Sequence, residues 1–314
     1  MTSKLLLATL ATAAASTVTG AAAQSNVTLY GRVDLSFAQQ ADATSNKEVR
    51  NGSGSRFGLR GSEDLGDGLK AVFHLEHRFN ADTGAQNNAT RFWEGKSIVG
   101  LEGGFGRLTL GREENPAYTL SQNAADPWGG DTVAGNGSIV SGRIGSTRYS
   151  DAINYRYSGG GFTFGAQMTE GDGQDDRPYS LGLGYAAGAL KLGLGFENPG
   201  DADDDWLTLS GSYNFGSFEL RGLVGNGSNA NGQKHAAWLL AGTMKLGSGE
   251  LRLSYGQLKN KDLDVVADKQ LGLGYHHAMS KRTTLYADLT SEKRDNLPGN
   301  RESTGWDIGI KHNF

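Results

Sequence analysis

Apolar and polar residues alternate one by one along most of this 314-residue chain, and that alternation constrains its fold more than any other feature. In VTLYGRVDLSF, for example, one side carries the apolar residues Val27, Leu29, Val33, Leu35 and Phe37. The same period of two recurs in FTFGAQMTE, LKLGLGFE and LRLSYG. Successive side chains of a strand point to opposite faces, so this pattern predicts strands. After the first 24 residues we find no convincing apolar stripe with the 3.6-residue period of a helix.

The connections between these segments also alternate in length. Short ones rich in glycine, such as GGG at 159–161 and LGSG at 246–249, alternate with longer polar ones such as EKRDNLPGNRES. Counting the segments between them predicts sixteen strands, which start near residues 26, 54, 68, 92, 106, 148, 162, 179, 189, 204, 217, 234, 249, 268, 282 and 302. An even number of up-and-down strands, with short turns at one end and long loops at the other, is typical of a transmembrane β-barrel.

A barrel of about 16 strands encloses an aqueous channel, and its closure pairs every backbone group that an open edge would expose to lipid. Small residues on the polar face are consistent with a water-filled interior. A secreted β-sandwich or solenoid would show the same alternation. Three features favour the barrel: charges and glycines on the polar face, aromatic residues near strand ends on the apolar face, and a last strand that reaches the final residue. We therefore predict an all-β fold, a 16-stranded antiparallel transmembrane β-barrel.

The first residues, MTSKLLLATLATAAASTVTGAAAQ, form a separate segment. Lys4 precedes an apolar run that ends in the small residues Ala21, Ala22 and Ala23. This is the order of a cleaved secretory signal, and the run is too short and too rich in Ala and Thr for an anchor helix. We predict a signal peptide at 1–23 and one barrel domain at 24–314.

Composition and motifs narrow the function further. The chain has no cysteine, so it has neither disulfides nor thiolate metal sites. Its formal net charge of -4 argues against a nucleic-acid partner. No GxSxG or HExxH motif is present, and only His74 shares a predicted inward face with an acid, Glu76. We expect neither enzymatic activity nor a cofactor.

Four segments carry a resemblance to a known family. TLYGRVDLSF, SRFGLRGSEDLGDGLKAVFHLE, SIVGLEGGFGRLTLGRE and the terminal KHNF closely resemble the trimeric general porins of Gram-negative outer membranes, and most closely the neisserial-type branch of β- and γ-proteobacteria. The resemblance covers the whole mature chain and is strongest over 26–113 and at the C-terminus. It implies an outer-membrane homotrimer in contact with lipopolysaccharide, with a water-filled channel through which ions and small hydrophilic solutes diffuse passively.

The last strand carries a second implication of the resemblance. In this family a terminal Phe after alternating apolar residues is the signal read by the barrel-insertion machinery. Phe314, Ile310 and Ile308 match that signal and are expected to face lipid, although His312 interrupts the apolar phase. Lys311 is then expected to face the pore, as is Asn313.

Members of this family fold a long third loop into the barrel, where it narrows the channel. The connection of sufficient length here is about 113–147, and it contains DPWGGDT, which resembles the family's loop motif of Pro, acid, aromatic, Gly and Gly. Acid and Pro are exchanged in this chain, which leaves open which carboxylate faces the constriction. The candidates are Asp126, Asp131, Glu113 and Glu114. An ordinary extracellular loop is the alternative, although loops of this length are usually functional.

Arginines are expected on the wall opposite that loop. By motif, the matching residues are Arg32, Arg56, Arg112 and Arg148. Strand phase independently directs Arg32 and Arg56 away from lipid, and Arg60 shares the phase of Arg56. For each arginine, the alternative is a salt bridge or a loop brace with no effect on solutes.

The charges conflict on ion selectivity. Clustered arginines favour anions, whereas acidic loops at the mouth favour cations. The loop acids are Asp172, Asp175, Asp176, Asp201, Asp203, Asp204, Asp205, Asp264 and Asp268. The balance leans weakly toward anions.

Two other functions stay open beside a general diffusion channel. One is a channel selective for a solute such as phosphate or an organic acid, and the other is a soluble secreted β-domain that binds glycans. The run DADDDW offers carboxylates for a divalent cation, but it lacks the EF-hand spacing, so we predict a solvated loop and no metal site.

Overall fold

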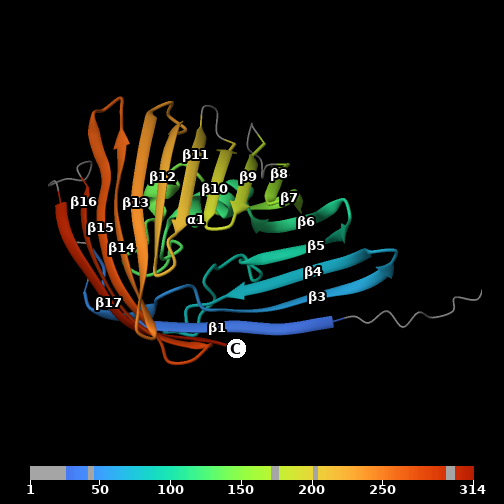
Figure 1. Ribbon diagram of the computed structural model, residues 1–314, viewed down its shortest axis with the longest axis horizontal. Coiled ribbons are helices and arrows are strands. Elements are labelled where there is room, and N and C mark those ends of the chain that lie inside the picture. The colour runs from blue at the N-terminus through green and yellow to red at the C-terminus, as the bar shows by residue number, and fades with distance from the viewer. Residues whose placement is uncertain (1–25, 42–45, 171–176, 201–203, 295–300) are drawn as a thin grey trace, which may run out of the picture.

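The computed structural model describes residues 26–41, 46–170, 177–200, 204–294 and 301–314, so the predicted signal segment 1–23 lies outside the described residues. Within these ranges seventeen strands form one sheet in which neighbours pair antiparallel (Figure 1). The strands are β1 Asn26–Gln39, β2 Glu48–Asn51, β3 Arg56–Gly66, β4 Leu69–Arg78, β5 Lys96–Gly103, β6 Gly106–Glu114, β7 Arg148–Gly159, β8 Phe162–Thr169, β9 Tyr179–Ala187, β10 Leu190–Asn198, β11 Asp205–Asn214, β12 Phe218–Ser228, β13 Lys234–Leu246, β14 Gly249–Asn260, β15 Val265–Ala278, β16 Thr283–Arg294 and β17 Arg301–Asn313.

Pairing between β1 and β17 closes the sheet into a barrel. The closure extends to the last residue, because the Phe314 N–H donates to the Gly31 carbonyl at 3.0 Å and the Gly31 N–H donates back to Phe314 at 3.0 Å. Gly31 is required here, since a Cβ at this position would overlap the Phe314 ring. The apolar terminus thus completes the ladder that leaves no open edge.

Strands β2 and β3 are two parts of one wall strand. Both pair with β1, β2 along Leu35–Ala38 and β3 along Asn26–Arg32, so the described residues form a wall of sixteen strands, which confirms the predicted number. The predicted start near 54 was too late, because the strand begins at Glu48. NGSGS, at 51–55, has the composition of a loop and separates β2 from β3. The Ser53 N–H donates to the Asp34 carboxylate at 3.0 Å and so ties this segment to β1.

The alternation also sets the two faces as predicted. On β1 the outward residues Val27 and Leu29 are each 62% exposed, whereas the inward Asp34 is fully buried. On β17 Ile308 and Ile310 are exposed on the outer face, as is Phe314 just beyond the strand. A continuous apolar outer belt and a polar lumen are what a strand crossing lipid requires.

No helix among the described residues is long and apolar enough to cross a membrane.

The segment between β6 and β7 packs against the inner wall of the barrel. Its helical pieces within the described residues are the π-helix η1 Tyr118–Gln122 and the short helices α1 Asn123–Ala125 and α2 Gly137–Val140. We call residues 115–147 the third loop. The loop lies inside the curve of the sheet (Figure 1) and packs mainly against β8–β17. It also approaches the first strands, because the Thr132 N–H donates to the Gly52 carbonyl at 3.1 Å and Asp131 lies 3.9 Å from Arg32 on β1.

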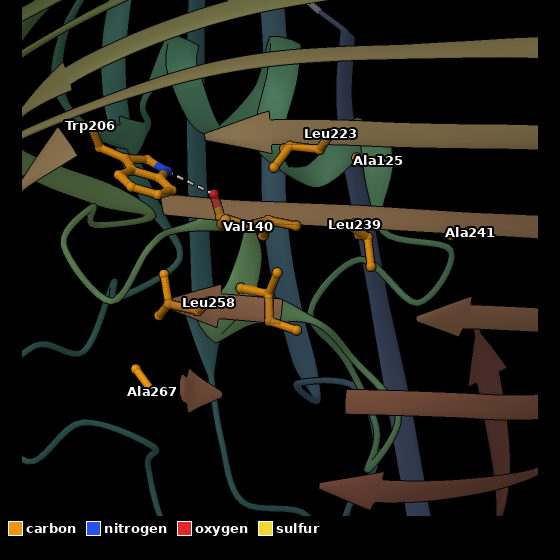
Figure 2. Packing of buried hydrophobic residues seen from close by; sticks show 10 residues of the cluster. Ala125, Val140, Trp206, Leu223, Leu239, Ala241, Leu258 and Ala267 are labelled. Atoms are coloured by element: carbon orange, nitrogen blue, oxygen red, sulfur yellow. Dashed lines mark hydrogen bonds between the residues drawn. The ribbon is translucent and has the colours of Figure 1, made fainter. Parts of the chain in front are cut away.

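Apolar side chains hold the loop to that wall (Figure 2). Trp206 is fully buried, and its indole N–H donates to the Val140 carbonyl at 2.9 Å. The remaining members of this cluster are Ala125, Ile139, Leu223, Leu239, Leu258, Ala237, Ala241 and Ala267. A hydrophobic core thus exists inside the barrel, between loop and wall.

This packing corrects the interpretation that small inward residues face water. In β8–β10 they face the third loop instead. A Cβ at Gly182 would lie 2.6 Å from the Pro116 carbonyl oxygen, and one at Gly193 would overlap the Leu120 carbonyl. Glycine at these positions lets the loop backbone approach the sheet, which is the usual reason for glycine where two backbones meet.

Candidate pore constriction

Three arginines form a row across adjacent strands of the wall. Arg32 on β1 is the register partner of Arg56 on β3, and Arg56 is the register partner of Arg78 on β4. Like charges directly opposite one another in a sheet are destabilising. A row of this kind therefore needs fixed partners, and the wall supplies them.

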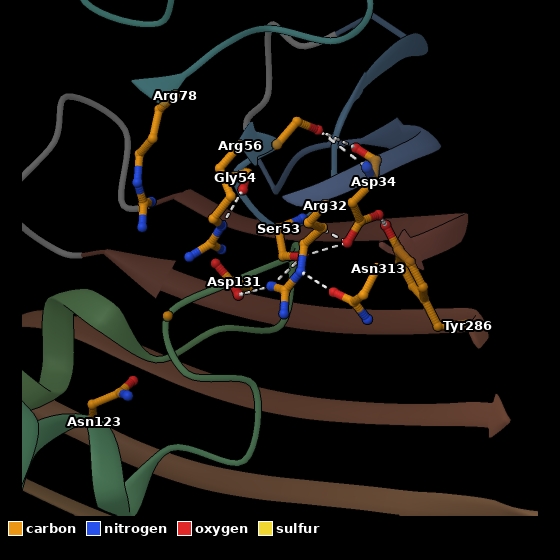
Figure 3. Close-up of polar contacts among 12 residues, drawn as sticks. Arg32, Asp34, Ser53, Gly54, Arg56, Arg78, Asn123, Asp131, Tyr286 and Asn313 are labelled. Carbon is orange, nitrogen blue, oxygen red and sulfur yellow. Dashed lines mark hydrogen bonds and ion pairs between the residues drawn. The ribbon is translucent and has the colours of Figure 1, made fainter. Parts of the chain in front are cut away.

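Each guanidinium in the row is tied to the wall at its Nε atom. Arg32 donates to Asn313 Oδ1 at 3.0 Å, Arg56 to the Gly54 carbonyl at 2.9 Å, and Arg78 to Glu76 Oε1 at 3.1 Å. Arg32 Nη1 also donates to Ser53 Oγ at 3.1 Å. Figure 3 shows the three guanidinium groups extending toward the loop that carries Asp131. The row presents positive charge to the lumen with little freedom to rearrange.

A cavity of about 500 Å³ lies beside this row, and its lining includes the acids Asp131 of the third loop and Glu114 of β6. Asp131 Oδ2 lies 3.9 Å from Arg32 Nη1. Arg148 joins the basic side and donates to Glu114, which also lies 3.4 Å from Lys96 Nζ. The cavity is lined in part by Arg32, Arg56, Arg78, Arg148, Glu114, Tyr118, Asn123 and Asp131. The arrangement places Asp131 of the third loop opposite the arginine row of the wall.

The surroundings shift the pKa values of two ionisable side chains of the third loop, Asp131 and Tyr118. Burial raises the pKa of Asp131 above its ordinary value, although the nearby guanidinium groups of Arg56 and Arg32 oppose the rise. The Asp131 side chain nevertheless keeps 34% of its surface exposed, so solvent still reaches it. Burial raises the pKa of Tyr118 to about 12, so its hydroxyl is neutral at physiological pH.

The structure brings together most of the predicted arginines but not all. Arg32, Arg56 and Arg148 line the cavity, whereas Arg60 lies on the same inward face outside it, with its Cζ 5.2 Å from the centroid of the Tyr30 ring. Arg112 is also outside this lining.

Arg112 differs from expectation because neighbouring wall groups hold its side chain outside the cavity. It is the register partner of Ser97, and its Nε donates to the Glu94 carbonyl at 2.8 Å. Its Nη1 also donates to Ser150 Oγ at 3.2 Å, so the guanidinium is held at the end of β6, where the register between β6 and β7 is irregular.

Sequence reasoning missed Arg78, which completes the row. The signal was present in HLEHR, because Arg78 shares the phase of His74 and Glu76, which were already placed on the inward face.

The four candidate acids differ in position: Glu113 and Glu114 lie at the end of β6, whereas Asp126 and Asp131 lie in the third loop. Asp131 and Glu114 line the cavity, whereas Asp126 is only 2% exposed and organises the loop backbone. Asp126 accepts the N–H groups of Gly130 at 2.7 Å and Asn136 at 2.8 Å. Glu113 accepts from Thr109 Oγ1 at 2.6 Å and lines a smaller adjoining cavity. The motif's open question is thus answered geometrically: Asp131, not Asp126, faces the arginines.

Glu197 on β10 was not foreseen, and it ties both ends of the loop to the wall. It accepts from Asn115 Nδ2 at 3.1 Å near the start of the loop and from the Ser146 N–H at 2.7 Å near its end. Tyr149 Oη donates to the same carboxylate at 2.6 Å. No local motif marks such a residue, because its partners are distant in sequence.

The acids expected at the mouth give less support to cations than their number implied. Asp268 lies in β15, is fully buried, and pairs with Arg143 of the third loop at 3.0 Å. Asp264 pairs with Lys259. Residues 172, 175, 176, 201 and 203 lie outside the described part of the chain, as does the first half of the candidate cation-binding run at 201–206.

Comparison with known proteins places this geometry in a family. The model of the Gram-negative porin family matches residues 8–297. The outer membrane porin protein 32 of Delftia acidovorans is 34% identical, with 94% of this chain and 95% of that protein covered. The major outer membrane protein P.IB of Neisseria gonorrhoeae is 33% identical over 52% of this chain and 49% of its own length.

A solved structure agrees in fold as well as sequence. The anion-selective porin from Comamonas acidovorans superposes with a TM-score of 0.82 at 30% identity, covering 93% of this chain and all of that one. The family model, the related sequences and the solved barrel structure all agree. The chain therefore belongs to the Gram-negative porin family of outer-membrane channel proteins.

Proposed function

We propose that this outer-membrane porin conducts small hydrophilic ions by passive diffusion with a preference for anions. The observation that carries this proposal is the register-paired row of Arg32, Arg56 and Arg78, joined at the cavity by Arg148. A relative of similar fold and 30% identity is described as an anion-selective porin, which supports the same preference here.

The mechanism is a transverse field across the constriction. Anions pass along the arginine wall and cations along the loop side near Asp131, while apolar solutes find no place to shed their water. Clustered like charges in a low-dielectric wall concentrate counter-ions. Weak contact at several sites suits downhill flow, because a tightly held ion would block the channel.

Assembly and export complete the proposal. Signal segment 1–23 would be removed, leaving barrel 24–314 with its third loop at the constriction. Phe314, Ile310 and Ile308 would present the C-terminal strand to the insertion machinery, which fits their exposure on the outer face. We infer a homotrimer in contact with lipopolysaccharide, as the family resemblance implies.

Reconstitution in a planar bilayer tests the proposed function. The unheated protein is inserted, and the reversal potential is measured across a KCl gradient. We expect ohmic current steps in groups of three and a reversal potential that favours chloride. A potential that favours potassium would refute the anion preference, and correctly folded, inserted protein without conductance would refute the channel.

A solute-selective channel is the second candidate, because the arginine cluster would also bind phosphate or a carboxylate anion. Adding inorganic phosphate or a dicarboxylate separates the two functions. A diffusion channel shows no block at low concentrations of either anion, whereas a selective one shows concentration-dependent block by its solute.

Lowering the pH from about 7 to about 4 is expected to increase the anion preference, because carboxylates gain protons while arginines stay charged. Burial raises the pKa of Asp131, so this group loses its charge at a higher pH than an ordinary aspartate. Asp131→Asn is expected to show a stronger anion preference at neutral pH and a smaller change on acidification. Asp67→Asn, in the exposed tight turn between β3 and β4, is the control, and the channel that carries it should respond to acidification like the native one. Equal titration of Asp131→Asn and the native protein would contradict this role.

A further inference from the structure

Glu76 is a buried negative charge within the basic side of the constriction. It lies on β4 and is 5% exposed. Its Oε1 lies 3.1 Å from Arg78 Nε and 3.9 Å from Arg56 Nη1. Its Oε2 accepts a hydrogen bond from Tyr30 Oη at 2.8 Å. One carboxylate thus contacts two members of the arginine row and is held by a third side chain.

The surrounding backbone is shaped to admit this carboxylate. Gly95 lies against it, and a Cβ there would overlap the Glu76 side chain. Gly58 is the register partner of Glu76 and lies beneath the Tyr30 ring, where a Cβ would be 2.7 Å from Cε1. Burying a carboxylate is costly unless it is paired and hydrogen-bonded, and both conditions are met.

The charge of Glu76 acts on the same ions as the arginines. Its negative charge offsets one positive charge of the arginine row, because the carboxylate lies against Arg56 and Arg78. Passive flow requires that anions enter easily and leave quickly. A row of guanidinium groups with no negative charge behind it would hold multivalent anions longer.

We propose that Glu76 is a specificity-determining residue that limits the strength of the anion preference by offsetting one charge of the arginine row. This inference rests on the proposed anion-preferring channel. It differs from a purely structural role, in which Glu76 would only brace Arg78. The two roles predict changes of opposite sign.

Glu76→Gln keeps the shape of the side chain and removes its charge. We expect the chloride-to-potassium permeability ratio to rise about two- to fivefold, the range for one charge at about 8 Å in water with and without screening by salt. We also expect sodium sulfate to block the current at lower concentrations than in the native channel. An unchanged or reduced ratio would overturn the proposal, because loss of a brace would displace Arg78 and weaken the anion preference.

A second pair of variants keeps the test decisive if Glu76→Gln does not assemble. Arg78→Gln alone should lower the permeability ratio, and Glu76→Gln combined with Arg78→Gln should restore it toward the native value, because the net charge is then unchanged. A double variant no more anion-selective than Arg78→Gln would refute the charge role.

Controls separate this inference from the proposed function. Glu63→Gln removes an acid at an exposed site near the C-terminal end of β3 and should leave the ratio unchanged. The native ratio tests the anion preference itself. The direction in which Glu76→Gln changes the permeability ratio tests the role of Glu76, whatever the native ratio is. The anion preference can therefore fail its test while the role of Glu76 passes, and the reverse also holds.

Discussion

Replacing both Arg56 and Arg78 by serine is expected to lower the chloride-to-potassium permeability ratio by about four- to 25-fold, on the basis of about two- to fivefold for each charge. Both side chains line the cavity, and each is held by its Nε, so their charges remain at fixed positions in the native channel. Serine also removes two long side chains, and we expect the single-channel conductance to increase. Reversal potentials and current steps in planar bilayers measure both quantities.

Arg112→Ser is the matched control for this experiment. Arg112 occurs in a motif that the family resemblance associates with the constriction, but its Nε donates to the Glu94 carbonyl and it does not line the cavity. The permeability ratio of Arg112→Ser should stay near native. A large fall in this variant, or native selectivity in the double serine variant, would show that the basic wall lies elsewhere.

Gly193→Ala is expected to displace the third loop and to destabilise the barrel by about 1–3 kcal/mol, the usual cost of overpacking a well-filled interior. The added Cβ would overlap the Leu120 carbonyl, which is backbone and cannot move aside by a side-chain rotation. Because the loop forms one side of the constriction, its displacement should also change the conductance. Thermal unfolding of the purified, folded protein and single-channel recordings measure the two effects.

Gly184→Ala is the control for the loop. It lies on the neighbouring strand β9, where a Cβ would meet Leu120 Cδ2 at an ordinary contact distance of 3.5 Å. We expect its heat stability and conductance to be close to native. If Gly193→Ala behaves in the same way, the loop does not depend on close backbone contact with β10.

Much of the barrel follows from the sequence alone because its physical basis is local. Each strand crosses a boundary between lipid and a polar lumen, so its side chains must alternate, and alternation can be read without knowing any neighbour. The wall-strand number, the lipid face of Ile308 and Ile310, and the inward direction of Arg32 and Arg56 all follow from that rule. Arg78 could have been assigned correctly by the same rule.

Only the tertiary structure decided how the loop and wall meet. Asp126 and Asp131 stand five positions apart in one loop, yet one binds loop N–H groups and the other faces the arginines. The pairing of Arg148 with Glu114 requires an irregular register between β6 and β7.

Glu197 and Trp206 hold segments that are far away in sequence. Such contacts depend on where the barrel wall brings distant residues together, and no local period of the chain encodes that.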